Sequence, residues 1–222
     1  MKVNGIHYRS IWYDHELSKV KIIDQRWLPH DFKIAELETL QSFATAIRDM
    51  WVRGAPLIGA TAAYGIAVAL RTDSSNHNLK LAYDTLIETR PTAINLRWSL
   101  DRMQKELAEV PEGQRPVVAL EAAHRIADED VEINKNIGEF GLKIIKKLAE
   151  SKKQGEPVRL LTHCNAGWPA TVDWGTATSP MYHAHNENIP IHVWVDETRP
   201  RNQGGMTAWE LQSHGISNTY IT

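Results

Sequence analysis

The sequence predicts an α/β protein with two parts, a small β and helical region followed by the first half of an open parallel sheet. Two observations predict this class. Up to about residue 153, short extended runs give way to segments in which apolar residues recur at intervals of three and four, as in helices. From Pro157 onward, short apolar runs alternate with helical segments, which is the pattern of strand–helix–strand units in parallel sheets.

The composition is that of an ordinary soluble globular protein. Of 222 residues, 42% are hydrophobic and 23% charged, with a net charge of −2, so the totals give no reason to expect nucleic acid or a membrane as partner. The single cysteine cannot form an internal disulfide, which favours a reducing cytoplasm. The first residues lack the apolar core of a signal peptide, and no apolar run reaches membrane-spanning length.

The region 1–153 is expected to be a β/helical domain that ends in a long connecting helix. Short extended runs between residues 3 and 29 predict a small β region. Pro56 is expected at the first position of a helix rich in small residues, which we expect to be central and buried. The predicted helices are 34–52, 56–70, 79–89, 93–110 and 117–153.

The region 154–222 is expected to form a Rossmann-like catalytic domain. Its predicted βαβαβ order is one half of a doubly wound parallel sheet. Because the sequence reaches Thr222 at the end of a strand, we expect this domain to be incomplete. The predicted strands are 158–163, 191–195 and 218–221, and the predicted helices are 169–186 and 206–214.

Cys164 follows the first of these strands and precedes the predicted helix at 169. Ligands of open α/β sheets collect at the carboxyl ends of the strands, and a helix N-terminus at that edge favours a thiolate. On residue type alone, a buried and inert cysteine is equally reasonable. The neighbouring motifs favour a functional cysteine.

Two arginines precede predicted helix starts. In Arg53-Gly54-Ala55-Pro56, the glycine permits a tight turn and the arginine can close over an anion held by free N–H groups. Arg90-Pro91-Thr92 repeats this arrangement before the next helix. The alternative is a solvated arginine at each junction, but the pair together predicts a phosphate clamp.

The polar loop 196–204 leaves a predicted strand at the edge where ligands bind. Asn202 and Gln203 can bind sugar hydroxyls or phosphate oxygens, while Asp196 and Glu197 can orient those side chains. One cysteine with a few histidines does not make a zinc site. The sequence also lacks the glycine-rich motifs of dinucleotide and P-loop sites, which argues against a nucleotide cofactor.

Taken together, these motifs resemble the methylthioribose-1-phosphate isomerases, in the superfamily that includes the regulatory subunits of initiation factor 2B. The resemblance runs from the first strands to the last residue, and its longest motif is the loop after the second strand of the sheet. The matching segments are 53–59 (RGAPLIG), 90–96 (RPTAINL), 162–167 (THCNAG), 175–177 (GTA), 195–204 (VDETRPRNQG) and 207–211 (TAWEL).

The resemblance implies an aldose–ketose isomerase of methionine salvage that converts 5-methylthioribose 1-phosphate into 5-methylthioribulose 1-phosphate. It also implies a homodimer that needs no metal or nucleotide. By the family pattern, Cys164 is one catalytic acid/base residue. Arg53, Arg90 and Gln203 bind the phosphate, with the backbone of Gly54 and Ala55.

One departure bears on activity. The family's second catalytic group, an aspartate in a Gly-Ala-Asp-Arg motif, would lie beyond Thr222, so this chain by itself is expected to be inactive or nearly so. Three alternatives stay open: an isomerase of 5-deoxyribose 1-phosphate, a non-catalytic subunit like those of initiation factor 2B, and a hydrolase with Cys164 as nucleophile. For the hydrolase, His163 is expected to point to the strand's other side, away from Cys164.

Overall fold

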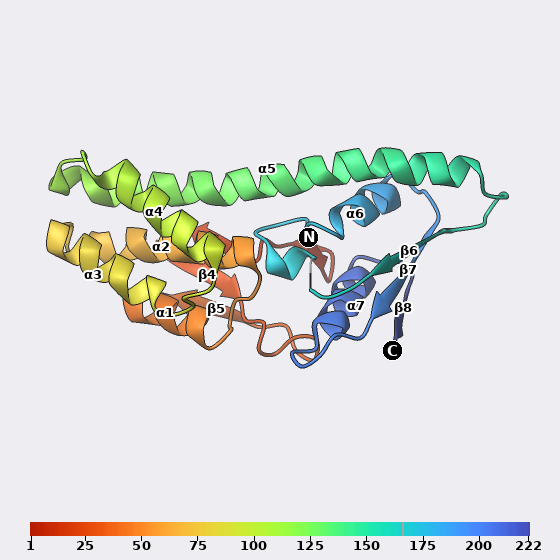
Figure 1. Ribbon diagram of the computed structural model, residues 1–222, viewed down its shortest axis with the longest axis horizontal. Helices are drawn as coiled ribbons and strands as arrows, with labels where there is room; N and C mark the ends of the chain where they lie inside the picture. The colour runs from red at the N-terminus through yellow and green to blue at the C-terminus, as the bar shows by residue number, and fades with distance from the viewer. Residues whose placement is uncertain (166) are drawn as a thin grey trace. The chain divides into compact units, whose positions relative to one another are not determined.

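The computed structural model describes residues 1–165 and 167–222 and confirms the α/β class (Figure 1). It contains two compact units. We call Ser10–Asp130 the helical unit, and Met1–Arg9 together with Val131–Thr222 the sheet unit. The predicted domains are 1–153 and 154–222. The two compact units are divided differently, because the long helix belongs in part to each unit and the first residues group with the sheet. The predicted division stays a prediction.

The helical unit contains a three-stranded antiparallel sheet, as expected for a small β region. Its third strand corrects the prediction of a helix from Ile34. Residues 34–37 pair with the neighbouring strand, with Ile34 opposite Ile23 and Leu37 opposite Val20. The strands are β3 (Ile11–Asp14), β4 (Lys19–Ile23) and β5 (Ile34–Leu37), in the order β3-β4-β5.

The helix that follows β5 begins where a capping box fixes its start. The Thr39 hydroxyl accepts from the Ser42 backbone N–H, and the Ser42 side chain accepts in return from the Thr39 N–H. These bonds satisfy backbone donors that would otherwise be unpaired, so helix α1 (Leu40–Arg48) starts six residues after the predicted start at Ile34. The apolar spacing before Thr39 was compatible with both structures, and the strand pairing decided between them.

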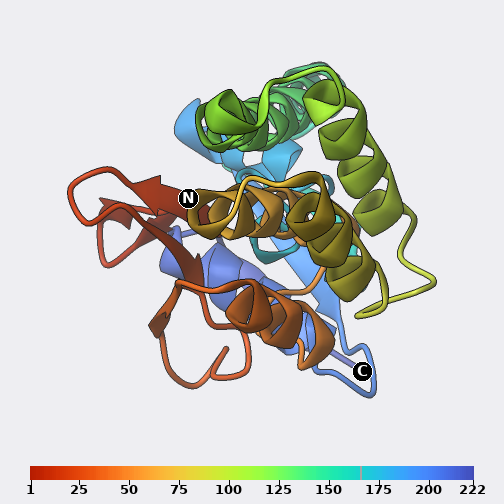
Figure 2. The ribbon, with the colours of Figure 1, turned by 90° about the vertical axis from the view of Figure 1, so that its left-hand side faces the viewer.

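Helix α2 (Ala55–Thr72) is the core of the helical unit, as predicted from its small residues. It is long and apolar enough to cross a membrane by length and composition, but 78% of that window is buried inside the protein. Gly59 lets α4 approach, since a Cβ there would lie 3.0 Å from the Asn95 carbonyl oxygen. Figure 2 gives a second view of the helices of this unit. Its other helices are α3 (Asn76–Ile87), α4 (Ile94–Leu107), the 3-10 turn η1 (Glu112–Gln114) and the first part of α5 (Arg115–Glu150).

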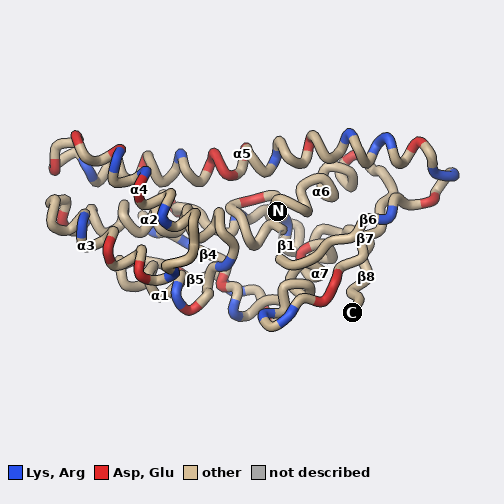
Figure 3. Tube along the Cα trace, viewed as in Figure 1, with Lys and Arg blue, Asp and Glu red and all other residues tan. Residues whose placement is uncertain are grey.

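The sheet unit confirms the predicted βαβαβ half-sheet. Its three strands are parallel and lie in the order β6-β7-β8, with a helix in each connection. The rest of α5 belongs to this unit, and lysines gather toward its C-terminal end (Figure 3). The elements are the hairpin β1 (Lys2–Val3) and β2 (Ile6–His7), then β6 (Val158–Thr162), α6 (Ser179–Asn186), β7 (Ile191–Asp196), α7 (Gln203–Ser213) and β8 (Asn218–Ile221).

The predicted helix 169–186 was wrong in its first part. Only the short turn η2 (Trp168–Ala170) and the later helix α6 are helical. Between them, Trp174 and Gly175 both have positive φ, at 70° and 77°, which a helix cannot accommodate. Tertiary contacts hold Asp173 outside a helix, since its carboxylate binds the Met1 ammonium at 2.7 Å and the His7 ring at 2.7 Å. Consequently no helix begins directly after Cys164, and the expected helix N-terminus beside the thiol is absent from the described residues.

Candidate active site

Cys164 lies at the carboxyl end of β6, exposed, with a φ of 67°. Its backbone is held on both sides by threonine hydroxyls. The Cys164 N–H donates to Thr198 Oγ1 at 3.1 Å, and the Cys164 carbonyl accepts from Thr207 Oγ1 at 3.0 Å. The cysteine is therefore at the carboxyl edge of the sheet, as predicted, and it is exposed rather than buried.

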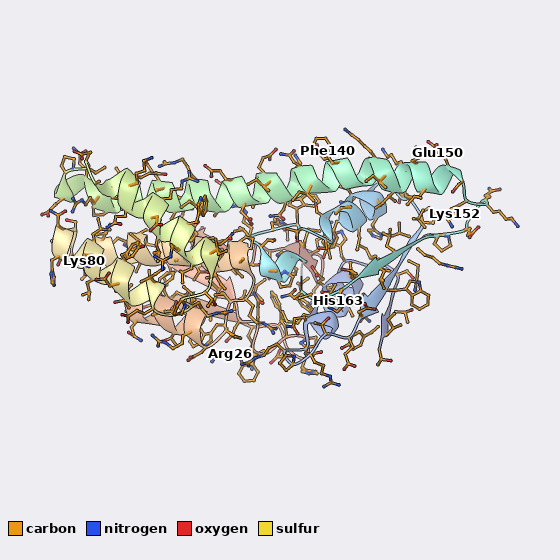
Figure 4. The ribbon with its side chains drawn as sticks, in the orientation of Figure 1. Arg26, Lys80, Phe140, Glu150, Lys152 and His163 are labelled. Carbon is orange, nitrogen blue, oxygen red and sulfur yellow. The ribbon has the colours of Figure 1, made fainter. Side chains whose placement is uncertain are left out.

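The polar loop after β7 lies beside Cys164. Asp196 ends the strand, and its Oδ2 lies 3.4 Å from Nδ1 of His163, which is labelled in Figure 4. The backbone N–H of Glu197 donates to the Ile221 carbonyl at 2.7 Å, which ties the loop to β8. His163, directly after β6, thus has a carboxylate partner at the end of the neighbouring strand β7.

Gln203 is the first residue of α7, where the loop after β7 becomes a helix. Its backbone N–H donates to the Thr198 carbonyl at 3.2 Å. Its side-chain Oε1 is buried and has no hydrogen-bond partner in the part of the chain that the structure describes. Gly204 permits this arrangement, since a Cβ there would lie 2.1 Å from the Asp196 carbonyl oxygen. The side chain of Gln203 thus retains an acceptor for a ligand.

The two arginine-preceded helix starts lie together within the helical unit. Gly54 is the N-cap of α2 with a φ of 96°, and neither α2 nor α4 has a side-chain cap, so N–H groups of both first turns are left for a ligand. The two helices cross near their starts, where the Ser99 hydroxyl donates to the Gly59 carbonyl at 2.7 Å. Arg90 Nη1 is buried without a hydrogen bond to any described residue. The anion site expected at Arg53, Gly54, Ala55 and Arg90 stays a prediction.

The structure therefore groups the expected site residues into two sets. Cys164 and Gln203 belong to the sheet unit, and Arg53, Gly54, Ala55 and Arg90 belong to the helical unit. Within residues 1–165 and 167–222, no three His, Cys, Asp or Glu side chains are grouped so that they could hold a metal ion.

Sequence reasoning missed Glu210, a buried carboxyl group that supports the loop after Cys164. Glu210 Oε2 accepts from the Trp168 N–H at 2.7 Å and from the Tyr182 hydroxyl at 2.8 Å. Burial raises the pKa of Glu210 to about 8, although both hydrogen bonds act to lower it. Gly167 leaves room for this carboxyl, because a Cβ there would lie 1.6 Å from Oε1. The sequence contained one signal of this role. Glu210 is acidic, although it lies on the buried face of the predicted helix 206–214.

The raised pKa of Glu210 predicts a loss of stability as the pH rises from about 4.5 to about 8. Between pH 4.5 and about 8, the Glu210 carboxyl keeps its proton in the folded protein. In the unfolded chain, where its pKa is near 4.5, it has released that proton. The stabilising contribution is therefore complete below pH 4.5 and is lost as the pH rises through about 8. Glu210→Gln keeps the shape but cannot ionise. Between pH 6.5 and 8, the free energy of unfolding of the native protein should fall by about 2 kcal/mol relative to the variant.

Urea unfolding of both proteins across this pH range measures that difference. Taking the difference reduces the opposing contribution of the Met1 amine, whose pKa burial lowers and Glu210 acts to raise. Starting at pH 6.5 also avoids His214, whose pKa burial lowers to about 4. Parallel stability curves for the two proteins would show that Glu210 ionises normally.

A helical unit followed by a parallel half-sheet, with a cysteine at its carboxyl edge, describes an α/β protein of the doubly wound class. The sequence model of the Initiation factor 2 subunit family matches residues 51–222. The chain belongs to this family.

Curated relatives are similar along the whole of this chain. It is 58% identical over 222 residues to the methylthioribose-1-phosphate isomerase of Rhizobium meliloti, covering 100% of this chain and 61% of the relative. The enzyme of the same name from Brucella anthropi is 57% identical over 222 residues, again with 100% and 61% covered. The chain thus spans about 60% of the length of the curated relatives it matches.

Two solved structures share the fold. The 5-methylthioribose 1-phosphate isomerase of Pyrococcus horikoshii OT3 has a TM-score of 0.84 and 36% sequence identity, covering 97% of this chain and 60% of that one. The translation initiation factor eIF-2B, subunit delta, from A. fulgidus has a TM-score of 0.83 and 40% identity, covering 97% and 62%. One fold in this family therefore carries both an enzyme name and a translation-factor name.

Proposed function

We propose that this chain belongs to an aldose–ketose isomerase that converts 5-methylthioribose 1-phosphate into 5-methylthioribulose 1-phosphate. The observation that carries the proposal is the exposed Cys164, held at the carboxyl edge of the sheet by Thr198 and Thr207. The identity of 57–58% to relatives with that enzyme name supports the choice of substrate.

The reaction requires groups that move protons between adjacent carbons. The ring bond between C1 and O4 breaks, the C2 hydrogen is transferred to C1, and the O2 proton passes to O4, so substrate and product are isomers. A thiol that alternates between thiolate and thiol can take part in the transfer at C1 and C2. We assign this role to Cys164, which lies where ligands of parallel sheets bind.

Phosphate binding is the role proposed for Arg53, Arg90 and Gln203. Uncapped N–H groups of α2, with the backbone at Gly54 and Ala55, favour an anion beside Arg53. The unpaired buried Nη1 of Arg90 supports its assignment, because a buried polar atom without a partner is costly and a phosphate oxygen would pair with the guanidinium. For Gln203, the side-chain amide NH₂ would donate to the phosphate, while the unpaired Oε1 would accept from a sugar hydroxyl.

A hybrid protein tests the proposal. Residues 1–222 of this chain replace the matched 61% of the Rhizobium meliloti relative, and the rest of that relative completes the protein. The hybrid is incubated with 5-methylthioribose 1-phosphate, and ketose formation is followed. The same assay is run with 5-deoxyribose 1-phosphate as substrate, and with the present chain by itself in place of the hybrid. Turnover of the methylthio sugar is expected in the hybrid. A folded hybrid that turns over neither sugar would refute the isomerase.

Arg53→Ala in the hybrid is expected to raise KM for the sugar phosphate by about tenfold to a hundredfold with a smaller change in kcat, because it removes a charge-assisted contact to the phosphate. Arg71→Ala is the matched control. Arg71 lies in the last turn of the same helix and donates to the Ser18 carbonyl at 2.8 Å. Steady-state kinetics of the two variants give the comparison, and equal KM values for both would remove Arg53 from phosphate binding.

A non-catalytic subunit is the second candidate, because the A. fulgidus structure with the same fold carries a translation-factor name. The exposed cysteine and the uncapped helix starts favour the enzyme, since a scaffold needs neither a thiol held at a sheet edge nor an anion site. The hybrid assay distinguishes the two. We also propose that the enzyme works in the cytoplasm as a homodimer; the single cysteine in the sequence supports a reducing compartment.

A further inference from the structure

The backbone of Cys164 has an uncommon conformation. Its φ of 67° lies in the left-handed region, where side chains other than those of glycine, asparagine and aspartate are rare. The residue lies two positions after the end of β6, so the backbone conformation there sets the direction in which its side chain departs from the sheet. A residue stays in such a conformation when its surroundings over-determine it.

Two side-chain hydroxyls provide that restraint. Thr198 Oγ1 accepts from the Cys164 N–H at 3.1 Å, and Thr207 Oγ1 donates to the Cys164 carbonyl at 3.0 Å. The two bonds act on the two peptide units that flank the Cys164 Cα. Fixing both units restricts φ and ψ together, so the direction of the Cα–Cβ bond is fixed as well.

The two threonines come from elements that are themselves anchored. The Thr198 carbonyl accepts from the N–H of Gln203, and Thr207 is only 1% exposed on the second turn of α7. Gln203 and Thr207 are four residues apart, so they share one face of α7. The same face of α7 therefore carries Gln203, which is proposed to bind the sugar phosphate, and Thr207, which is one of the two restraints on Cys164.

We propose that Thr198 and Thr207 are positioning residues, which hold Cys164 in its left-handed conformation and so direct its thiol toward the reacting carbons of the sugar. This inference rests on the proposed isomerase. A merely structural role, in which each hydroxyl only satisfies a backbone group, predicts lower stability with an unchanged turnover rate.

Isosteric variants of Thr207 in the hybrid protein separate these roles. Thr207→Val keeps the shape and removes the hydroxyl, while Thr207→Ser keeps the hydroxyl. We expect Thr207→Val to lower kcat by about tenfold to a hundredfold with KM nearly unchanged, because an ångström-scale displacement of a catalytic group has effects of this size. Thr207→Ser should restore most of the rate. Thr198→Val and Thr198→Ser should behave in the same way.

Thr61→Val is the matched control. The Thr61 hydroxyl is also fully buried and donates to a backbone carbonyl, that of Leu57, at 2.7 Å, but it lies in the middle of α2. Melting curves establish that each variant is folded. An active wild-type hybrid whose Thr207→Val and Thr198→Val variants keep kcat would overturn the inference and leave the isomerase intact. Equal loss in the serine and valine variants would also overturn it, whereas an inactive wild-type hybrid would refute the proposed function itself.

Discussion

Replacing Cys164 with serine should lower kcat of the hybrid protein by about 10²- to 10⁴-fold, with little change in KM. The serine hydroxyl is a much weaker acid than a thiol, so the variant loses general acid/base catalysis while the phosphate contacts remain. Because Cys164 is exposed, the substitution should leave the thermal midpoint of unfolding unchanged. Initial rates of ketose formation with wild-type and variant hybrid proteins measure the effect.

The cysteine substitution has an internal control, since the printed sequence contains a single cysteine. If an alkylating reagent inactivates the hybrid by reacting with Cys164, the same reagent should not lower the rate of the Cys164→Ser variant. This comparison requires that cysteines in the added region are replaced first. If a folded Cys164→Ser hybrid keeps the wild-type rate, the thiol takes no part in proton transfer. The function of the exposed cysteine would then have to be sought elsewhere.

Gly175→Ala should destabilise the protein by about 3–5 kcal/mol, the largest effect on stability that we expect from one methyl group. Gly175 has a φ of 77°, and a Cβ there would lie 2.2 Å from the Gly167 carbonyl carbon and 2.4 Å from the Trp168 nitrogen. These are backbone atoms of the segment after Cys164, so they cannot move aside as a flexible side chain would. Urea unfolding monitored by tryptophan fluorescence gives the change in free energy.

Gly155→Ala is the matched control for the backbone conformation. Its φ is 79°, but a Cβ there meets nothing within 4 Å. Only the conformational cost should remain, about 1 kcal/mol. Equal losses in the two variants would show that the close approach at Gly175 has no energetic consequence.

Local sequence patterns predicted most of the sheet unit. Strand–helix alternation after Pro157 predicted a parallel half-sheet, because a helix between two strands is the usual connection of parallel strands, and the structure adds the order β6-β7-β8. The same reasoning placed Cys164 and the loop 196–204 at one edge. It failed at residues 171–178, where Asp173 binds the Met1 ammonium 172 positions away, a contact with no local pattern.

Within the helical unit, spacing predicted helices α2 to α5 but not strand β5. Residues 34–37 read as the first turn of a helix because Ile34 and Leu37 have helical spacing. Pairing with β4 and the capping box at Thr39 outweighed that preference, since they satisfy backbone groups that one helical turn would leave unpaired.

Sequence patterns alone were enough for the fold class, the helical core at α2 and the position of the cysteine at a sheet edge, because periodicity and turn residues act over a few positions. Tertiary structure decided how the site is held. The left-handed backbone of Cys164, its two threonine partners and the buried, proton-bearing Glu210 depend on residues 34 to 43 positions apart that meet only in the folded chain. Such contacts arise from packing and burial, which no single segment specifies.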